Sequence, residues 1–187
     1  MCWDSSQSGM FRAIMIDIIP SIFLLSFIVI AALWVLIPAL YGLPPITTRR
    51  ERIRRALQMA NLQPDEIFYD LGSGHGRVLV MAAKEFNARA VGIEVGPVQC
   101  VIAWLNALYN GVSSRVRVEA RNFYMADVSQ ADVVFAYLTS KQAPRLQTQL
   151  EKQLKHGTRV VTISFDFPDW KPTVIDREQL IFLYHMP

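Results

Sequence analysis

The chain has 187 residues, a formal net charge of +3 and a hydrophobic content of 52%. This length supports one domain of ordinary size with an appendage, and the hydrophobic content is high for a purely soluble protein. Residues 49–55 hold five arginines and one glutamate, so the rest of the chain together is slightly acidic. A nucleic-acid-binding domain would spread basic charge over its surface, and we expect no nucleic-acid partner.

The first element in chain order is an apolar stretch at residues 18–40, which contains no charged residue. About 20 such residues suffice to cross the hydrocarbon core of a bilayer, so we predict a transmembrane helix there, after a short tail at residues 1–17. A cleaved signal peptide is the competing interpretation. The leader lacks a basic start and a small-residue cleavage site, which argues against it.

The arginines of residues 49–55 predict the orientation of this helix, because basic flanks stay on the cytoplasmic side and bind anionic headgroups. We therefore expect a single-pass protein in contact with the lipid bilayer, with its N-terminus outside and its folded domain in the cytoplasm. Cys2 and Cys100 would then lie on opposite sides of the membrane. This arrangement predicts neither a disulfide nor a metal site.

Residues 41–61 are expected to form a connector and a basic amphipathic helix. Prolines interrupt the first part, and apolar residues recur at helical spacing in the second, at Ile53, Ala56, Leu57 and Ala60. The helix could pack on the domain with a solvated basic face, or lie along the membrane surface. The two interpretations are compatible.

Residues 62–187 alternate strand-like and helical segments, as in a parallel α/β sheet. The fold class that we predict is a Rossmann-like class I methyltransferase sheet with an antiparallel C-terminal pair, preceded by the membrane helix. Strands are expected near residues 67–71, 90–94, 116–119, 132–138 and 159–165, helices near 77–86, 97–110 and 143–154, and the closing pair at 173–175 and 180–184.

A glycine-rich loop follows the first of these strands. A dinucleotide-binding fingerprint would need its third glycine at Arg77, but here it comes one residue earlier. The pattern Asp-x-Gly-x-Gly-x-Gly instead resembles motif I of class I S-adenosylmethionine-dependent methyltransferases; a glycine turn without a ligand is the alternative. The resemblance implies a cofactor-binding set in this loop: Asp70, Gly72, Ser73, Gly74 and Gly76.

Three further residues are candidates for the cofactor site because ligands of such sheets bind at the carboxyl ends of the strands. Glu94 ends the second strand, where a carboxylate can accept from both ribose hydroxyls. Asn122, after the third strand, has an amide oxygen that can accept from the adenine amino group, or is only a turn-forming residue. Phe123 would supply apolar contact to the base. His75, inside the loop, is either a base or a side chain that points to solvent.

The acceptor side of the site is expected where the fourth and fifth strands end. Tyr137 and Asp166 are candidate proton relays, and three aromatic residues are candidates for lining the substrate site: Phe165, Phe167 and Trp170. Aromatic faces can hold a cation or an amine-bearing chain. The same aromatic residues could equally form a lid that packs on the domain.

Several features together resemble a family of small membrane-anchored lysine methyltransferases, whose eukaryotic members modify the adenine nucleotide translocase and the ATP synthase c subunit. They are the connector prolines, the helix before the first strand, the loop at residues 70–77, Gly92-Ile93-Glu94 and the late stretch at residues 167–172. His75 stands where the family usually has Asp, and Asn122 replaces the usual acid. The resemblance implies S-adenosyl-L-methionine as cofactor and a membrane-protein substrate.

The expected reaction is an in-line transfer of a methyl group to a lysine, whose ammonium, with a pKa of about 10.4, must first lose its proton. Asp166 or Tyr137 could relay that proton. The leading hypothesis is methylation of a lysine of a membrane protein at the cytoplasmic membrane surface. The alternatives are methylation of a membrane-embedded small molecule, such as a quinone or lipid, and a noncatalytic cofactor-binding membrane module.

Overall fold

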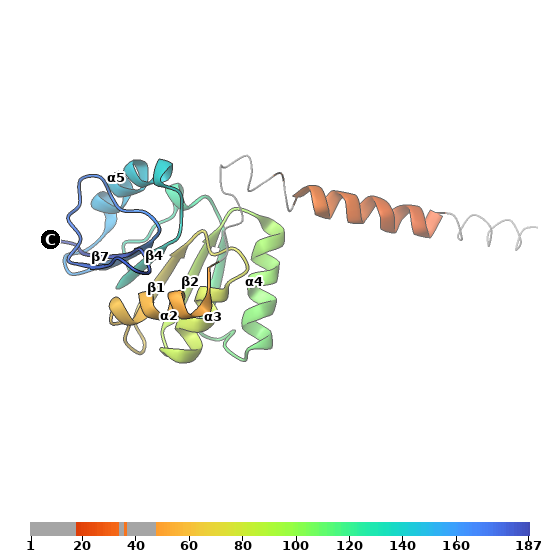
Figure 1. Ribbon diagram of the computed structural model, residues 1–187. Helices are drawn as coiled ribbons and strands as arrows, with labels where there is room; N and C mark the ends of the chain where they lie inside the picture. Colours follow the sequence, from red (N-terminus) through yellow and green to blue (C-terminus); the bar gives the residue numbers. More distant parts are fainter. Residues whose placement is uncertain (1–17, 34–35, 37–47) are drawn as a thin grey trace, which may run out of the picture.

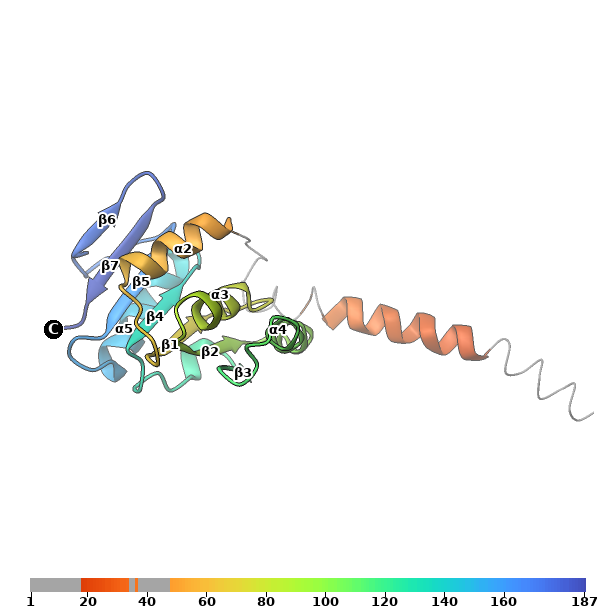
Figure 2. The same cartoon turned by 90° about the horizontal axis from the view of Figure 1, so that it is seen from below.

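The structure is a computed structural model that describes residues 18–33, 36 and 48–187. A helix runs over residues 18–33 and stands clear of the folded domain in both views (Figures 1 and 2). Its large apolar side chains, from Ile18 to Leu33, are between 38% and 72% exposed. Among the described residues, no helix has the length and apolar character needed to span a bilayer. The predicted tail at 1–17, and residues 34–35 and 37–47 of the predicted span and connector, lie outside the described residues.

The domain is built on a seven-stranded sheet with the order β3-β2-β1-β4-β5-β7-β6. The first five strands are parallel, and β7 runs antiparallel between β5 and β6, which confirms the predicted parallel sheet and closing pair. Strands β4 and β5 end two residues earlier than predicted. The strands are β1 (Ile67–Leu71), β2 (Arg89–Glu94), β3 (Val116–Ala120), β4 (Val133–Ala136), β5 (Arg159–Ile163), β6 (Val174–Asp176) and β7 (Ile181–His185).

Helices cover both faces of this sheet. Helices α2 and α3 share one buried cluster with β1 and β4, and α4 packs against α3 on the same side, while α5 belongs to the cluster on the other face. Strands buried on both faces explain the near-continuous apolar runs of the sequence. The helices are α2 (Arg50–Met59), α3 (Arg77–Glu85), α4 (Pro97–Tyr109) and α5 (Ala143–Gln153), with short 3₁₀ turns η1 (Phe123–Met125) and η2 (Ser140–Gln142).

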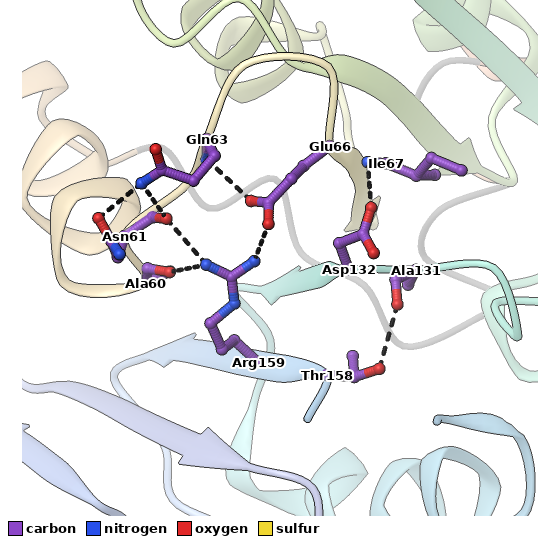
Figure 3. A network of polar contacts seen from close by, with 9 residues as sticks. All are labelled: Ala60, Asn61, Gln63, Glu66, Ile67, Ala131, Asp132, Thr158 and Arg159. Carbon is purple, nitrogen blue, oxygen red and sulfur yellow. Dashed lines mark hydrogen bonds and ion pairs between the residues drawn. The ribbon is translucent and has the colours of Figure 1, made fainter. Parts of the chain in front are cut away.

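A network of polar contacts connects the elements at the amino edge of the sheet, where the parallel strands begin (Figure 3). Arg159, at the start of β5, pairs with Glu66 and donates to the carbonyl oxygens of Ala60 and Asn61, each at 2.8 Å. The Asp132 carboxylate, just before β4, accepts from the backbone N–H that opens β1 at 2.8 Å. These contacts join the starts of β1, β4 and β5 to the α2–β1 turn, at the edge opposite the glycine loop.

Helix α2 runs antiparallel to the parallel strands, because its last residues meet the start of β5 while Arg52 reaches residues beyond the end of β5. Arg54 forms two hydrogen bonds with Glu85 at 2.6 and 2.9 Å, and Arg55 donates to Asp176 at 3.0 Å. These arginines are thus engaged with the domain, as the packed-helix interpretation predicts. The chain that precedes α2 therefore enters the domain at the carboxyl edge of the sheet.

Candidate active site

The glycine loop folds back onto β2 at the carboxyl edge. The N–H groups of Gly72 and Ser73 both donate to the carbonyl oxygen of Ile93, at 2.9 and 3.1 Å. Gly76 has a φ of +74°, and a Cβ there would lie 2.9 Å from the Cβ of Ala103 in α4, so the third glycine lets the loop touch this helix. Gly74 has a φ of +51°, and nothing lies within 4 Å of the position its Cβ would take. A ligand can therefore approach the backbone at Gly74.

Glu94 holds this loop from the end of β2. Its side chain is 6% exposed, and its two carboxylate oxygens accept from the N–H groups of Gly74 and Gly96, each at 2.8 Å. One carboxylate thus ties the loop after β1 to the loop after β2. Each oxygen keeps a second acceptor position, so the predicted ribose role is compatible with these bonds and stays a prediction.

Asp70 lies beneath the loop and is 2% exposed. Burial raises the pKa of its carboxyl to about 8, and the neighbouring charge of Glu94 adds to the effect. Its Oδ2 atom has no hydrogen-bond partner among the residues that the structure describes. A buried acceptor without a partner marks a place where a bound donor would be stabilised. Asp70 therefore fits a cofactor that brings such a donor.

Ser73 is also buried, but its side chain faces the sheet. A Cβ at Gly92 would lie 2.7 Å from its hydroxyl oxygen and 2.5 Å from Leu79, so the loop can sit this close to β2 only because residue 92 is a glycine. The Ser73 N–H is bonded to Ile93 and its carbonyl oxygen accepts from the Gly76 N–H at 2.8 Å, so the backbone of Ser73 shapes the loop, and contact of Ser73 with a cofactor stays a prediction. Gly92 and Gly96 were not assigned to the site from the sequence, although two more glycines around Glu94 were a visible signal.

Asn122 and Phe123 follow β3, as expected for residues near the base of a nucleotide. The amide oxygen of Asn122 accepts from the Tyr124 N–H at 3.0 Å and caps η1, which is the turn-forming role. Phe123 is 4% exposed and packs with Leu71 and Ile93, and Gln149 donates to its carbonyl oxygen at 2.7 Å. Contact of either residue with adenine stays a prediction.

Tyr137 lies immediately after β4 and is half-buried. The Arg52 guanidinium lies 5.8 Å from the centre of its ring, and donates to the carbonyl oxygen of Gln179 at 2.6 Å and to Ser164 Oγ at 2.9 Å. Arg52 therefore places a fixed positive charge beside the ends of β4 and β5. This residue was missed from the sequence because the arginine run was interpreted as a group facing lipid or solvent.

The segment after β5 packs as a lid on α5 and β7. Phe165 and Phe167 are each 2% exposed, and the Phe167 ring lies 4.6 Å from that of Trp170 and 5.2 Å from that of Tyr184. The indole N–H of Trp170 donates to Glu151 at 2.7 Å. This burial matches the alternative in which the aromatic residues form a lid, and direct contact of the three rings with a substrate stays a prediction.

Asp166 is exposed, between the two buried phenylalanines. In the described part of the chain no hydrogen bond joins it to Tyr137, so the structure does not link the two candidate relays directly. His75 is half-buried, and its carbonyl oxygen accepts from the Asn106 amide at 3.2 Å. This bond fixes the loop to α4 through the backbone of residue 75, whatever its side chain does.

The sheet order, the glycine loop and the carboxylate at the end of β2 define a class I methyltransferase. The crystal structure of an RNA methyltransferase from Salinibacter ruber in complex with S-adenosyl-L-homocysteine superposes with a TM-score of 0.74 at 35% identity, covering 76% of this chain and 94% of that one. Residues 70–174, more than half of the chain, match the model of the ANTKMT methyltransferase domain. The chain belongs to this family, and its cofactor is S-adenosyl-L-methionine.

Several relatives carry names that specify an acceptor. A protein-lysine N-methyltransferase from Saccharolobus islandicus (strain REY15A) is 40% identical over 130 residues, which are 69% of this chain and 81% of the relative. The adenine nucleotide translocase lysine N-methyltransferase of Mus musculus is 27% identical over 140 residues, 74% of this chain and 60% of the relative. The ATP synthase c-subunit lysine N-methyltransferase of Xenopus laevis is 28% identical over 130 residues, and the chain covers 57% of its length.

Proposed function

We propose that this methyltransferase modifies a lysine of a membrane protein at the cytoplasmic surface of a bilayer. The observation that carries the lysine acceptor is the 40% identity to a protein-lysine N-methyltransferase over most of both chains. The names of two other relatives, which specify the c subunit of ATP synthase and the adenine nucleotide translocase, support a membrane-protein acceptor.

The residues at the carboxyl edge fit the cofactor. Glu94 would hold the ribose hydroxyls, the unpartnered Oδ2 of Asp70 would accept from a donor of the cofactor, and the open side of Gly74 would let it approach the backbone. S-adenosyl-L-methionine supplies a methyl group bound to a sulfonium. The chain's part is to bind and orient the two reactants and to exclude water.

Arg52 bears on the protonation of the incoming lysine. A like charge disfavours the ammonium form, so a lysine brought to the ends of β4 and β5 would meet a lowered pKa beside the fixed guanidinium of Arg52. We propose that the Asp166 carboxylate accepts the released proton, directly or through one water, or that the Tyr137 hydroxyl relays it by accepting it while passing its own proton to water. The nitrogen is then free to attack.

The membrane location rests on the N-terminal segment. Residues 18–40 carry no charge, and the described helix at residues 18–33 leaves its apolar side chains exposed. Arg49 and Arg50, which precede and open α2, are exposed and available to anionic headgroups. Since the chain enters the domain at the carboxyl edge, an anchor there would hold the site near the bilayer and raise the effective concentration of membrane substrates.

The experiment is a labelling assay on native membranes with methyl-labelled S-adenosylmethionine. The proposal expects label in protein, on a lysine identified by mass spectrometry, whereas label in the organic-solvent extract would indicate a lipid or quinone acceptor instead. Gly74→Arg should abolish labelling by filling the open side of the loop. Gly157→Arg is the matched control, because Gly157 also has a positive φ and open space at its Cβ position but lies before β5 at the opposite edge. Equal labelling by the parent and by Gly74→Arg would show that this chain is not the methyltransferase that transfers the label.

A further inference from the structure

Helix α4 presents an unusual outer face. Its 13 residues, PVQCVIAWLNALY, include no charged side chain. Ala103 and Ala107 are fully buried and form the inner face. Five large apolar side chains on the outer face are between 48% and 92% exposed, and we call them the α4 apolar face: Val101, Trp104, Leu105, Leu108 and Tyr109.

The spacing of these five residues places them on one stripe, because residues three, four and seven positions apart share a helix face. A surface helix of a soluble domain normally turns charged and polar residues outward. Helix α5 of the same domain follows that rule, with Arg145, Glu151 and Lys152 exposed. The α4 apolar face reverses it, and contiguous apolar surface of this kind marks a contact with another apolar phase or molecule.

The position of α4 favours a bilayer as that phase. The helix starts at the carboxyl edge, directly after β2, which is also the edge where the N-terminal chain enters the domain. If residues 18–40 lie in a membrane, only residues 41–49 connect them to α2, and at about 3.5 Å per residue these hold the start of α2 within roughly 35 Å of the bilayer. The carboxyl edge, where α4 starts, is then held near the membrane surface.

The composition of the α4 apolar face suits the interface of a bilayer. Trp and Tyr favour the level of the headgroups, and helices that lie in this plane combine aromatic and aliphatic residues on the immersed side. The exposed Lys84 donates to the Asn110 amide at 3.3 Å, which places its ammonium beside the C-terminal end of α4. There it can pair with an anionic headgroup.

We propose that the α4 apolar face lies on the cytoplasmic bilayer surface and holds the carboxyl edge of the sheet at a fixed height above the membrane. This inference rests on the membrane location in the proposed function. Contact along α4 adds a second attachment to the N-terminal anchor and removes the freedom of the domain to rotate on its connector. The glycine loop, which touches α4 at Ala103, is thereby oriented relative to the membrane.

Fluorescence quenching in vesicles tests the proposal with the full chain. The protein is reconstituted in phosphatidylcholine and phosphatidylglycerol vesicles, with or without bromine on the acyl chains. The emission of Trp104 is obtained by subtracting the spectrum of Trp104→Phe from that of the parent. It should lie at short wavelength and lose most of its intensity in brominated lipid. Trp170, which packs on Phe167 and Tyr184, gives the matched difference through Trp170→Phe and should keep its intensity.

The outcomes separate this inference from the proposed function. A protein that fails to float with the vesicles overturns the membrane location and this inference with it. A protein that floats while Trp104 stays unquenched overturns only the contact along α4, including the case in which a second copy or a partner protein covers the face. As a second variant, Leu105→Glu with Leu108→Glu should reduce quenching of Trp104 severalfold while S-adenosyl-L-homocysteine binding is unchanged. Unchanged quenching in that variant would also contradict the proposal.

Discussion

Replacement of Asp70 by Asn should make the protein more stable at neutral pH, by an amount that depends on pH. The folded carboxyl has a pKa raised to about 8 from an ordinary value of 3.8, so it stays protonated where the unfolded chain is ionised. The resulting loss of stability of the parent is absent below the pKa of Asp70 in the unfolded chain. It grows as the pH rises and is complete above the pKa of Asp70 in the folded chain. Between the two pKa values the free energy of unfolding of the parent falls by about 1.4 kcal/mol per pH unit, or roughly 3 kcal/mol between pH 5 and pH 7.

Thermal unfolding followed by near-UV circular dichroism measures this difference. At about 3 °C per kcal/mol for a domain of this size, the Tm of the parent should fall by roughly 8 °C more than that of Asp70→Asn between pH 5 and pH 7. Asp127→Asn is the control, because the Ser129 N–H lowers the pKa of Asp127 and keeps it ionised in both states over this range. Parallel curves for the parent and Asp70→Asn would show that Asp70 is ionised in the fold and refute the reasoning.

Three further changes test the site. Glu94→Gln removes the acceptor of one loop amide and should cost roughly 2 kcal/mol of stability, measured by unfolding. It should also weaken the binding of S-adenosyl-L-homocysteine, measured by calorimetry, and unchanged affinity would contradict the ribose role. Gly76→Ala adds a clash with α4 to a left-handed strain of about 1–2 kcal/mol, whereas Gly157→Ala adds strain alone, so the Tm of the former should fall further. Tyr137→Phe should lower kcat about 100-fold without changing cofactor affinity if its hydroxyl relays the proton. If instead only Asp166→Asn lowers kcat, Asp166 is the relay.

The sheet and the glycine loop could be predicted because their signals are local. A strand buried on both faces is a short apolar run, and the loop after β1 needs glycines wherever φ is positive or another element comes close. Both features are visible in consecutive residues. The apolar runs predicted the positions of β1 to β7. The predicted ends of β4 and β5 lie two residues too far along the chain, because Tyr137 and Ser164 already belong to the turns at the site.

Partners distant in sequence could not be predicted from such signals. The carboxylate of Glu94 was expected to face a ribose, but in the structure it also bridges two backbone amides, one of them 20 residues away. Arg52 reaches residues 112 and 127 positions away. An arginine run has the same appearance whether its side chains face lipid, solvent or a carboxylate across the domain. Only the tertiary fold distinguishes these cases.

The attachment of α2 has a mechanical consequence. Any pull on the chain ahead of residue 49 acts first on this helix, along its axis. Its start is held by Arg52, its middle by Arg54 and Arg55, and its end by the polar network around Arg159 at the amino edge of the sheet. These contacts distribute a force on α2 among helix α3, strand β6 and both edges of the sheet. A moving tether would therefore act first on α2 and its arginine contacts, and only through them on the sheet that carries the cofactor loop.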